Sequence, residues 1–315
     1  MYHSLESVCT DFHIYIFTFD DQCHSILTTL ELKNATLIPL AEFEDNRLLS
    51  VKNERTKAEY CWTCTSSTIE YIFKRYNVSQ CTYLDADLYF FNSPLDLTEE
   101  LNELKKILIT EHRYSWFSKM YEERRAGKYC VQYLTFTNDI DSRKVLNHWI
   151  DQCIDWCYNR YEDGKFGDQK YLDDWPIEYS SVKVSENPGA GVAPWNISAY
   201  NILYENDTLY GIEKKTKNKF KVVFYHFHFV RFLTDGYIDL GWNHIPESVI
   251  KHIYSPYLNL LTSLEKNLSD EFKDYKSPFY RTSIDNIKSG LKYFIKKTTG
   301  YNMLSIKKYG NLHLA

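Results

Sequence analysis

The hydrophobic pattern of residues 1–175 alternates between short apolar runs and longer segments in which apolar residues recur every three or four positions. The short runs predict strands, and the longer segments predict amphipathic helices. The predicted strands cover residues 12–19, 35–40, 81–84, 107–110 and 127–136. The predicted helices cover residues 23–32, 58–76, 97–106 and 142–158. Because strands and helices alternate, we expect an α/β fold, with a central sheet flanked by helices.

The pattern changes in the last third of the chain. Residues 221–230 predict one more strand, on which alternation places His226 and His228 on the same face. Beyond it the chain has the character of helices. We therefore expect an α/β domain over residues 1–255 and a helical, basic extension over residues 256–315.

The extension carries most of its positive charge between residues 276 and 308. Its segment 287–297 combines lysines with Ile287, Leu291 and Phe294, which predicts an amphipathic helix. Such a helix can lie on an anionic membrane surface, or it can be a solvated terminal helix that packs on the preceding domain.

Composition narrows the range of partners. The net charge is -5 and the isoelectric point is near 6.1, so there is no overall attraction to nucleic acid. The eight cysteines show no disulfide or zinc framework, and the pattern favours buried free thiols. No apolar run reaches the roughly 20 residues that a transmembrane helix needs, and the first residues do not resemble a signal peptide. We expect a cytoplasmic protein, with a peripheral position on the inner face of the membrane as an option.

The most informative stretch is Cys81-Thr-Tyr-Leu-Asp-Ala-Asp-Leu-Tyr-Phe90. Asp85 and Asp87 follow a predicted strand and stand two positions apart, so in extended chain both carboxylates point to the same side. Two carboxylates so close repel each other unless a cation or a shared proton intervenes. Mn²⁺ or Mg²⁺ would relieve the repulsion, because both prefer oxygen ligands. A pair of surface aspartates at a strand end is the alternative.

This stretch resembles the DxD motif of metal-dependent glycosyltransferases of the GT-A type, in particular the branch of glycogenin and the lipopolysaccharide galactosyltransferases. Two further segments are similar to that family and follow in the same order. Asp168-Gln-Lys-Tyr-Leu172 resembles its Asp-Gln-x-x-Leu element. The alternative is that Asp168 caps the N-terminus of a helix and has no other role. Val223-Phe-Tyr-His-Phe227 resembles its closing histidine strand. The loop Ala193-Pro-Trp-Asn196 is similar to loops of bacterial surface-polysaccharide sugar transferases.

The resemblance implies a GT-A type nucleotide-diphospho-sugar transferase fold with a mixed central sheet flanked by helices. It also implies a hexosyltransferase that transfers a sugar from a nucleotide-diphosphate donor to an acceptor hydroxyl on a glycan or glycolipid, and similarity to the glycogenin branch suggests retention of configuration. The role implied for metal binding falls on Asp85, Asp87 and His226, with His228 in reserve. The other implied roles are catalysis by Asp168 and Gln169, donor binding by Asp85, Asp87, Gln132, Arg231 and Lys57, and acceptor binding by Trp195 and Asn196.

The resemblance also implies that one strand is missing. In the related enzymes a first strand, whose end binds the nucleotide base, precedes a helix that resembles Tyr2-His-Ser-Leu5. We therefore expect an unpaired sheet edge or an open groove next to the strand 12–19.

Two other interpretations remain open. The chain could be a catalytically degenerate sugar-binding or scaffold protein on the same fold. It could also be a phosphotransferase of the haloacid-dehalogenase type, but Tyr89 stands where that motif has threonine or valine. The sequence does not identify the sugar, the nucleotide or the acceptor.

Overall fold

The computed structural model describes residues 1–273, 275 and 287–308. Part of the basic stretch, including Lys276 and Arg281, lies outside the described residues. Within the described ranges, no helix is both long enough and apolar enough to cross a bilayer.

The centre of the molecule is a four-stranded mixed sheet in the order β3-β6-β5-β7. Its strands are β3 (Gln80–Leu84), β6 (Tyr129–Thr137), β5 (Ile107–Glu111) and β7 (Val182–Val184). The pairing of β6 with β3 and with β5 is antiparallel, and that of β5 with β7 is parallel. The two inner strands are buried along almost their whole length, as their apolar runs predict. The predicted mixed α/β fold is confirmed.

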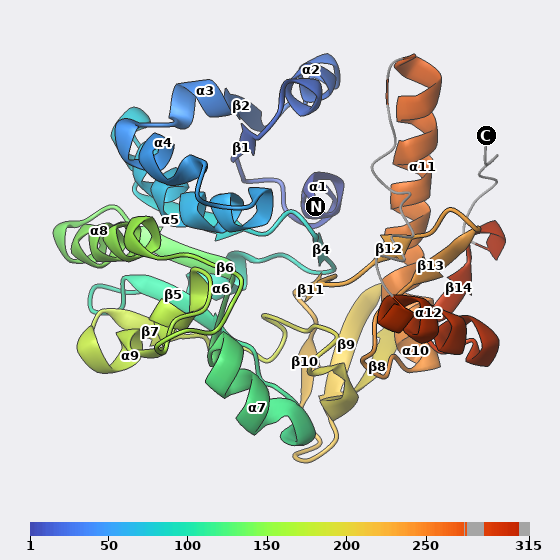
Figure 1. Ribbon diagram of the computed structural model, residues 1–315. Coiled ribbons are helices and arrows are strands. Elements are labelled where there is room, and N and C mark those ends of the chain that lie inside the picture. Colours follow the sequence, from blue (N-terminus) through green and yellow to red (C-terminus); the bar gives the residue numbers. More distant parts are fainter. Residues whose placement is uncertain (274, 276–286, 309–315) are drawn as a thin grey trace.

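Different elements cover the two faces of this sheet. The helices α5 (Lys57–Arg75) and α8 (Ile140–Asp155) lie side by side on one face and share a core with it (Figure 1). A capping box begins α5, since Thr56 and Glu59 each bond the other's backbone N–H. The other face packs on α1 (Tyr2–Val8) and on the two-stranded sheet of β4 (Leu88–Phe90) and β11 (Phe224–His226).

The first two strands form a separate parallel pair. They are β1 (Ile14–Thr18) and β2 (Ala35–Pro39), connected by α2 (Asp21–Thr29). Among the residues that the structure describes, β1 pairs only with β2, and β3 pairs only with β6. Within these residues, the unpaired edge expected next to the strand 12–19 is therefore present.

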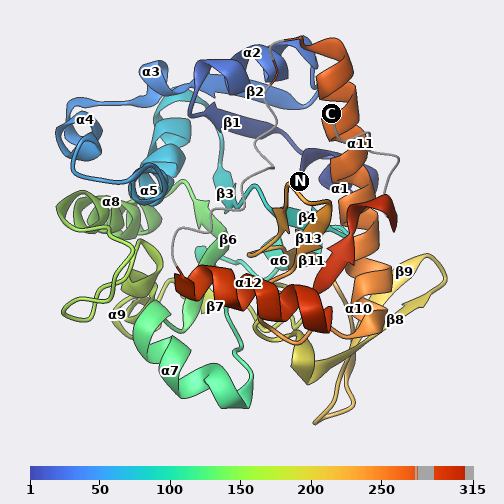
Figure 2. The same ribbon diagram turned by 45° about the vertical axis from the view of Figure 1, so that its right-hand side comes forward.

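The last part of the chain builds a second hydrophobic core on the opposite side of the molecule from α5 and α8 (Figures 1 and 2). Its antiparallel sheets are β8 (Tyr200–Glu205), β9 (Thr208–Glu213) and β10 (Lys219–Lys221), and β12 (Arg231–Phe232), β13 (Tyr237–Asp239) and β14 (Met303–Ser305). Its long helices are α11 (Ser255–Glu271) and α12 (Ile287–Thr299).

Short helical segments connect these elements. They are α3 (Leu40–Phe43), α4 (Asn46–Lys52), α6 (Leu95–Thr98), α7 (Trp116–Ala126), η1 (Gln169–Asp173), α9 (Trp175–Glu178), η2 (Ile197–Ala199), α10 (Glu247–Val249), η3 (Ile250–Tyr254) and η4 (Ile306–Lys308).

Two predicted elements are shorter than their sequence pattern indicates. The helix predicted for residues 97–106 is wrong, because α6 ends at Thr98. The strand predicted for residues 221–230 is interrupted, because Lys221 ends β10 and β11 covers Phe224–His226. The C-terminal extension is not helical throughout, since β14 pairs with β13 and Ile306 lies in the same core as residues before position 255.

Candidate functional site

Asp85, Asp87 and His226 meet where β3, β4 and β11 come together. The two aspartates lie between β3 and β4, and the antiparallel pairing of β4 with β11 places His226 opposite Leu88. Nε2 of His226 lies 3.1 Å from Oδ1 of Asp87 and 3.6 Å from Oδ2 of Asp85. One ligand atom from each of the three residues lies within 4.8 Å of the others. The structure thus brings together the three residues that the sequence suggests as metal ligands.

A buried hydrogen bond orients the imidazole of His226. Nδ1 of His226 lies 2.6 Å from Oε1 of Gln132, and an amide oxygen can only accept, so Nδ1 carries the proton. Nε2 of Gln132 donates in turn to Oγ1 of Thr110 at 3.3 Å. Nε2 of His226 therefore faces the two aspartates in a fixed orientation, as is usual for histidines that bind metals.

The charges of the three groups depend on one another. Burial raises the pKa of the Asp85 carboxyl, and the negative charge of Asp87 raises it further. The positive charge of His226 acts in the opposite direction but does not cancel the increase. For Asp87, His226 outweighs the effect of burial and lowers the pKa. Burial by itself would lower the pKa of His226, but the hydrogen bond and charge of Asp87 raise it well above its usual value. Without a metal, a proton on His226 therefore supplies the positive charge that the carboxylates require.

The three residues fit a divalent cation. Two carboxylate oxygens and one imidazole nitrogen converge from one side, and these donor types suit Mn²⁺ and Mg²⁺. The side chains of Asp85 and Asp87 are partly exposed to a cavity of about 680 Å³. A cation held there would keep positions open for water or for the oxygens of a substrate.

Asp168 and Gln169 line the same cavity. Asp168 precedes η1, but its side chain makes no capping hydrogen bond, so the N-cap interpretation is wrong. Burial, followed by the charge of Asp85, raises the pKa of Asp168 to about 7. Nε2 of Gln169 donates to the backbone oxygen of Ala126 at 2.7 Å.

Trp195 and Asn196 differ in their surroundings. Trp195 is half-buried and lines the cavity, where its ring lies 5.2 Å from that of His226 and its Nε1 donates to the backbone oxygen of His112. Asn196 is buried, and its amide bonds the backbone of His112, Gly191 and Ala193. Asn196 therefore holds the loop in place, while Trp195 presents a ring to the cavity.

The other residues that the resemblance suggests lie around the site as follows. His228 lines the cavity but lies beyond the end of β11. Gln132 is buried behind His226. Lys57 is exposed at the first position of α5, and Arg231 is exposed and stacks on Phe229; neither lines the cavity.

Several residues of the cavity wall were not predicted. Arg125 lies on α7 and bonds Glu122 at 3.0 Å. His112 follows β5, and its ring stacks on that of Tyr114. Burial lowers the pKa of His112 to about 3, so it is neutral at pH 7, and its Nδ1 has no partner among the described residues. The feature of the sequence that could have indicated His112 is its position at the carboxyl end of a predicted strand. Glu111 has the same position, so the feature does not single out His112.

No family model matches the chain. The uncharacterized protein YfnD of Bacillus subtilis (strain 168) is 29% identical over 285 residues, which are 89% of this chain and 89% of YfnD. The uncharacterized protein YfnF of the same organism is 27% identical over 232 residues, which are 72% of this chain and 75% of YfnF.

Solved structures that resemble this chain include two glycosyltransferases. The glycosyltransferase GlyE of Streptococcus pneumoniae TIGR4 has a TM-score of 0.38 and 18% identity, over 62% of this chain and 43% of GlyE. The chain thus spans less than half of GlyE. The galactosyltransferase LgtC, in complex with donor and acceptor sugar analogs, has a TM-score of 0.37 and 16% identity, over 62% of this chain and 71% of LgtC. An active-site mutant of LgtC has a TM-score of 0.43 and 14% identity, over 73% of this chain and 82% of the LgtC mutant. These likenesses are distant, and we carry no residue role over from them.

Replacing Gln132 should weaken metal binding without removing a ligand. In Gln132→Leu, His226 loses the acceptor that fixes its tautomer, and we expect the affinity for Mn²⁺ to fall roughly 10–100-fold. Isothermal titration calorimetry with Mn²⁺ would measure this. Thr110→Val serves as the control, since it removes the other partner of Gln132 and leaves the bond to His226 in place. Equal affinity of the Gln132 variant and the wild type would contradict the role of this bond.

Asp168 should make the metal-free protein less stable as the pH rises. Its pKa is about 7 when folded and about 3.9 in an unfolded chain, so the folded state favours the protonated form. The stability that this proton contributes is fully present below pH 4 and is lost as the pH rises through 7. Asp168→Asn lacks this dependence. Relative to the wild type, its free energy of unfolding should therefore increase between pH 5.5 and 7, by about 1.4 kcal/mol per pH unit at most, and should be level from pH 7 to 8.5.

Urea unfolding in the presence of EDTA would measure that difference, and Asp207→Asn, on an exposed hairpin, is the matched control. A difference between wild type and Asp168→Asn that stays constant over this pH range would show that Asp168 ionises normally.

Proposed function

We propose that this chain is a metal-dependent glycosyltransferase, which transfers a sugar from a nucleotide-diphosphate donor to an acceptor hydroxyl. The observation that carries the proposal is the convergence of Asp85, Asp87 and His226 in one cavity with Asp168 and Gln169. These five residues come from the three segments that resemble the GT-A enzymes, and in the sequence they are up to 141 positions apart (226 − 85).

Asp85, Asp87 and His226 would hold Mn²⁺ or Mg²⁺. When bound, the cation supplies positive charge to the diphosphate and stabilises it as the leaving group. Arg125 lines the same cavity, so we assign to it the role of a second cation for the diphosphate, in place of Lys57 and Arg231. Its Nε and Nη2 donate to Glu122 and its guanidinium lies over Phe166, with 5.2 Å to the ring centroid, so the remaining N–H groups are those that would bind phosphate oxygens.

Asp168 and Gln169 would orient the sugar and the acceptor. A carboxyl group with a pKa of about 7 exchanges protons readily near neutral pH, so Asp168 is suited to bond a sugar hydroxyl either as donor or as acceptor. The amide nitrogen of Gln169 is already bonded to Ala126, so its oxygen is the atom left to accept from a hydroxyl. Trp195 offers a flat ring against which a sugar could lie. We propose acceptors from bacterial surface-polysaccharide or lipopolysaccharide synthesis.

The test is turnover of nucleotide-diphosphate sugars by the purified chain with Mn²⁺, measured as released nucleotide. We expect activity with at least one donor and none in EDTA. Asp87→Asn keeps the shape of the ligand but not its charge. It should reduce turnover by more than the roughly 10–100-fold that is expected when a metal ligand loses its hydrogen-bond partner. Asp207→Asn should be as active as the wild type.

The outcomes separate the candidate functions. Binding of a nucleotide sugar without turnover would favour the degenerate, sugar-binding interpretation. Release of phosphate from a phosphomonoester, abolished in Asp85→Asn, would favour a phosphotransferase instead.

We also propose that α12 binds an anionic membrane surface. Its basic residues Lys296 and Lys297 bond Asp239 and Asp235 and so hold one side of the helix against the sheet of β12 and β13. The opposite side leaves Leu291, Phe294 and Ile295 exposed by 59%, 62% and 43%, so three large apolar side chains can contact the lipid.

Phe294→Glu should therefore reduce co-sedimentation with vesicles that contain anionic lipid, because it places a charge in the apolar contact and repels the lipid head groups. Leu104→Glu changes an apolar residue elsewhere that is even more exposed, at 79%, and should have no effect. A point variant is preferable to deleting residues 276–315, since the deletion would also remove β14. Vesicle binding that is unchanged in Phe294→Glu would exclude this surface.

A further inference from the structure

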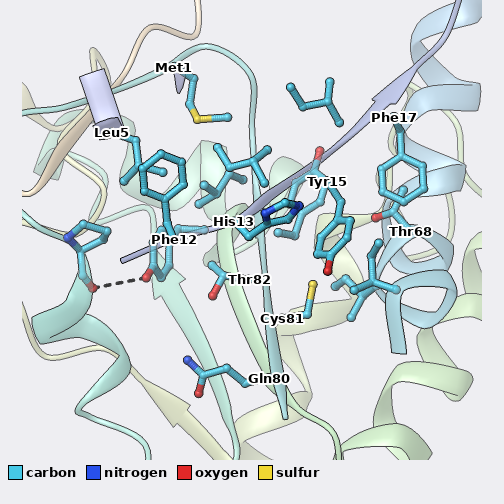
Figure 3. Close-up of a pocket in the computed structure, with 18 of the residues that line it drawn as sticks. Met1, Leu5, Phe12, His13, Tyr15, Phe17, Thr68, Gln80, Cys81 and Thr82 are labelled. Carbon is cyan, nitrogen blue, oxygen red and sulfur yellow. Dashed lines mark hydrogen bonds between the residues drawn. The ribbon is translucent and has the colours of Figure 1, made fainter. Parts of the chain in front are cut away.

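Two cavities of the molecule differ in the ligands that they suit. The cavity next to β1, of about 660 Å³, is lined mostly by apolar side chains such as Leu5, Phe12 and Phe17 (Figure 3). The cavity at the metal centre combines aromatic rings with polar atoms. Its lining includes His112, Tyr114, Trp195, His226 and His228. Rings that carry polar groups at their edges suit a ligand that is itself apolar on one face and polar at its rim, as a sugar is.

These aromatic side chains form one continuous wall. The imidazole of His112 stacks on the ring of Tyr114, with 4.6 Å between the ring centroids and 13° between the planes. Trp195 lies 5.3 Å from His112, 6.4 Å from Tyr114 and 5.2 Å from His226, again between centroids. A ligand that lies against Trp195 is therefore within reach of both the metal centre and Tyr114.

Hydrogen bonds fix the position of this wall. Arg113 has a left-handed backbone conformation, with a φ of +50°, which is uncommon for a residue other than glycine. Its guanidinium donates to three backbone oxygens of the segment 185–190, at 2.8 to 3.1 Å. The backbone oxygen of His112 accepts from Nε1 of Trp195 and from Nδ2 of Asn196, both at 2.8 Å. The residues that follow β5 and the loop that carries Trp195 are thus held together as one unit.

The hydroxyl group of Tyr114 has no hydrogen-bond partner among the described residues, although the side chain is half-buried in the cavity wall. Other tyrosines that are buried to a similar or greater degree do bond protein, among them Tyr60, Tyr83 and Tyr171. A buried phenol hydroxyl usually finds such a partner, because leaving it unpaired costs free energy. The hydroxyl of Tyr114 is therefore available to a ligand.

The surroundings of this hydroxyl define what it can bind. Burial raises the pKa of Tyr114, so the hydroxyl stays protonated and can donate a hydrogen bond. Glu122 and Arg125 line the same cavity but bond each other. Nδ1 of the stacked His112 is a second polar atom without a partner in the described part of the chain. The wall thus offers neutral polar groups next to aromatic faces.

We propose that Tyr114 is a specificity-determining residue, which binds a hydroxyl group of a neutral acceptor sugar. The pyranose ring would lie against Trp195, with one hydroxyl directed to the metal centre and another to Tyr114. This inference rests on the proposed glycosyltransferase function, because it takes the aromatic wall as the acceptor's side of the cavity.

The chemistry of the wall disfavours two other ligand classes. An apolar ligand would fill the space against Trp195 but would leave the hydroxyl of Tyr114 without a partner. An acidic sugar would require a cation, which the side chains of His112, Tyr114 and Trp195 do not supply at neutral pH. A neutral pyranose satisfies both the aromatic face and the unpaired hydroxyl.

The test uses methyl glycosides of glucose, galactose and mannose, together with the monodeoxy analogues of each. Their affinities for the full chain with Mg²⁺ are measured by saturation-transfer NMR. We expect at least one parent glycoside to bind, and the loss of one particular hydroxyl to weaken binding about tenfold, because a site built to bond a hydroxyl rejects the analogue without it. Tyr114→Phe should bind that parent and its deoxy analogue with equal affinity.

Tyr161→Phe is the matched control. It removes the hydroxyl of an exposed tyrosine that does not line the cavity, so the tenfold discrimination should persist. Discrimination that is the same in Tyr114→Phe and in the wild type would overturn the proposal. Failure of the wild type to bind any of the parent glycosides would overturn it as well.

A separate assay of nucleotide release distinguishes this inference from the function on which it rests. Tyr114 is assigned no contact with the donor, so Tyr114→Phe should release nucleotide at the wild-type rate when no acceptor is present, while its KM for an acceptor glycoside should rise about tenfold. If the wild type releases no nucleotide from any donor but discriminates between glycosides through Tyr114, the glycosyltransferase function fails and the role of Tyr114 in binding a sugar stands.

Discussion

The structure depends on one electrostatic constraint, the close approach of Asp85 and Asp87 at the end of β3. Two carboxylates in a partly buried position require a positive charge. His226 supplies it from β11, which is distant in the sequence. His226 can do so only because β11 pairs with β4 in a register that places it opposite Leu88. The small β4–β11 sheet therefore joins the N-terminal sheet to the second hydrophobic core and also fixes the geometry of the candidate metal centre.

The orientation of His226 depends on a second, less visible constraint. Gly191 has a φ of +99°, and a Cβ at this position would lie 2.5 Å from Nε2 of Gln132. The loop of residues 187–196 can therefore pass close to Gln132 only with glycine at 191. Gln132 in turn fixes the imidazole of His226. Glycine at position 191 thus allows close packing of protein on protein.

Local signals in the sequence predicted the centre of the site, and long-range contacts decided its surroundings. Asp85 and Asp87 were recognisable because their spacing matches the period of a strand. The alternation of side chains along a strand places His226 and His228 on the same face and does not show which of them lies next to the aspartates. In the structure it is His226, because β11 pairs with β4 and ends at His226.

The bond between Gln132 and His226 joins residues 94 positions apart, and no local pattern indicates it. The position of Arg125 on the cavity wall likewise depends on how α7 packs. The same limit applies to the fold. Strands such as 107–110 were found from their composition, whereas α6 was overestimated because a periodic pattern does not show where tertiary contacts end a helix.

Tyr83 ties the central sheet to the candidate metal centre. It lies on β3, lines the cavity at the metal centre, and donates its hydroxyl proton to Oδ1 of Asp85 at 3.0 Å. Burial, together with the charge of Asp85, raises the pKa of Tyr83 well above its usual value, so the hydroxyl stays protonated and can only donate to that carboxylate. The orientation of Asp85 therefore depends on the position of the Tyr83 ring, which β3 sets through its pairing with β6. The same strand thus places one of the two carboxylates and the group that orients it.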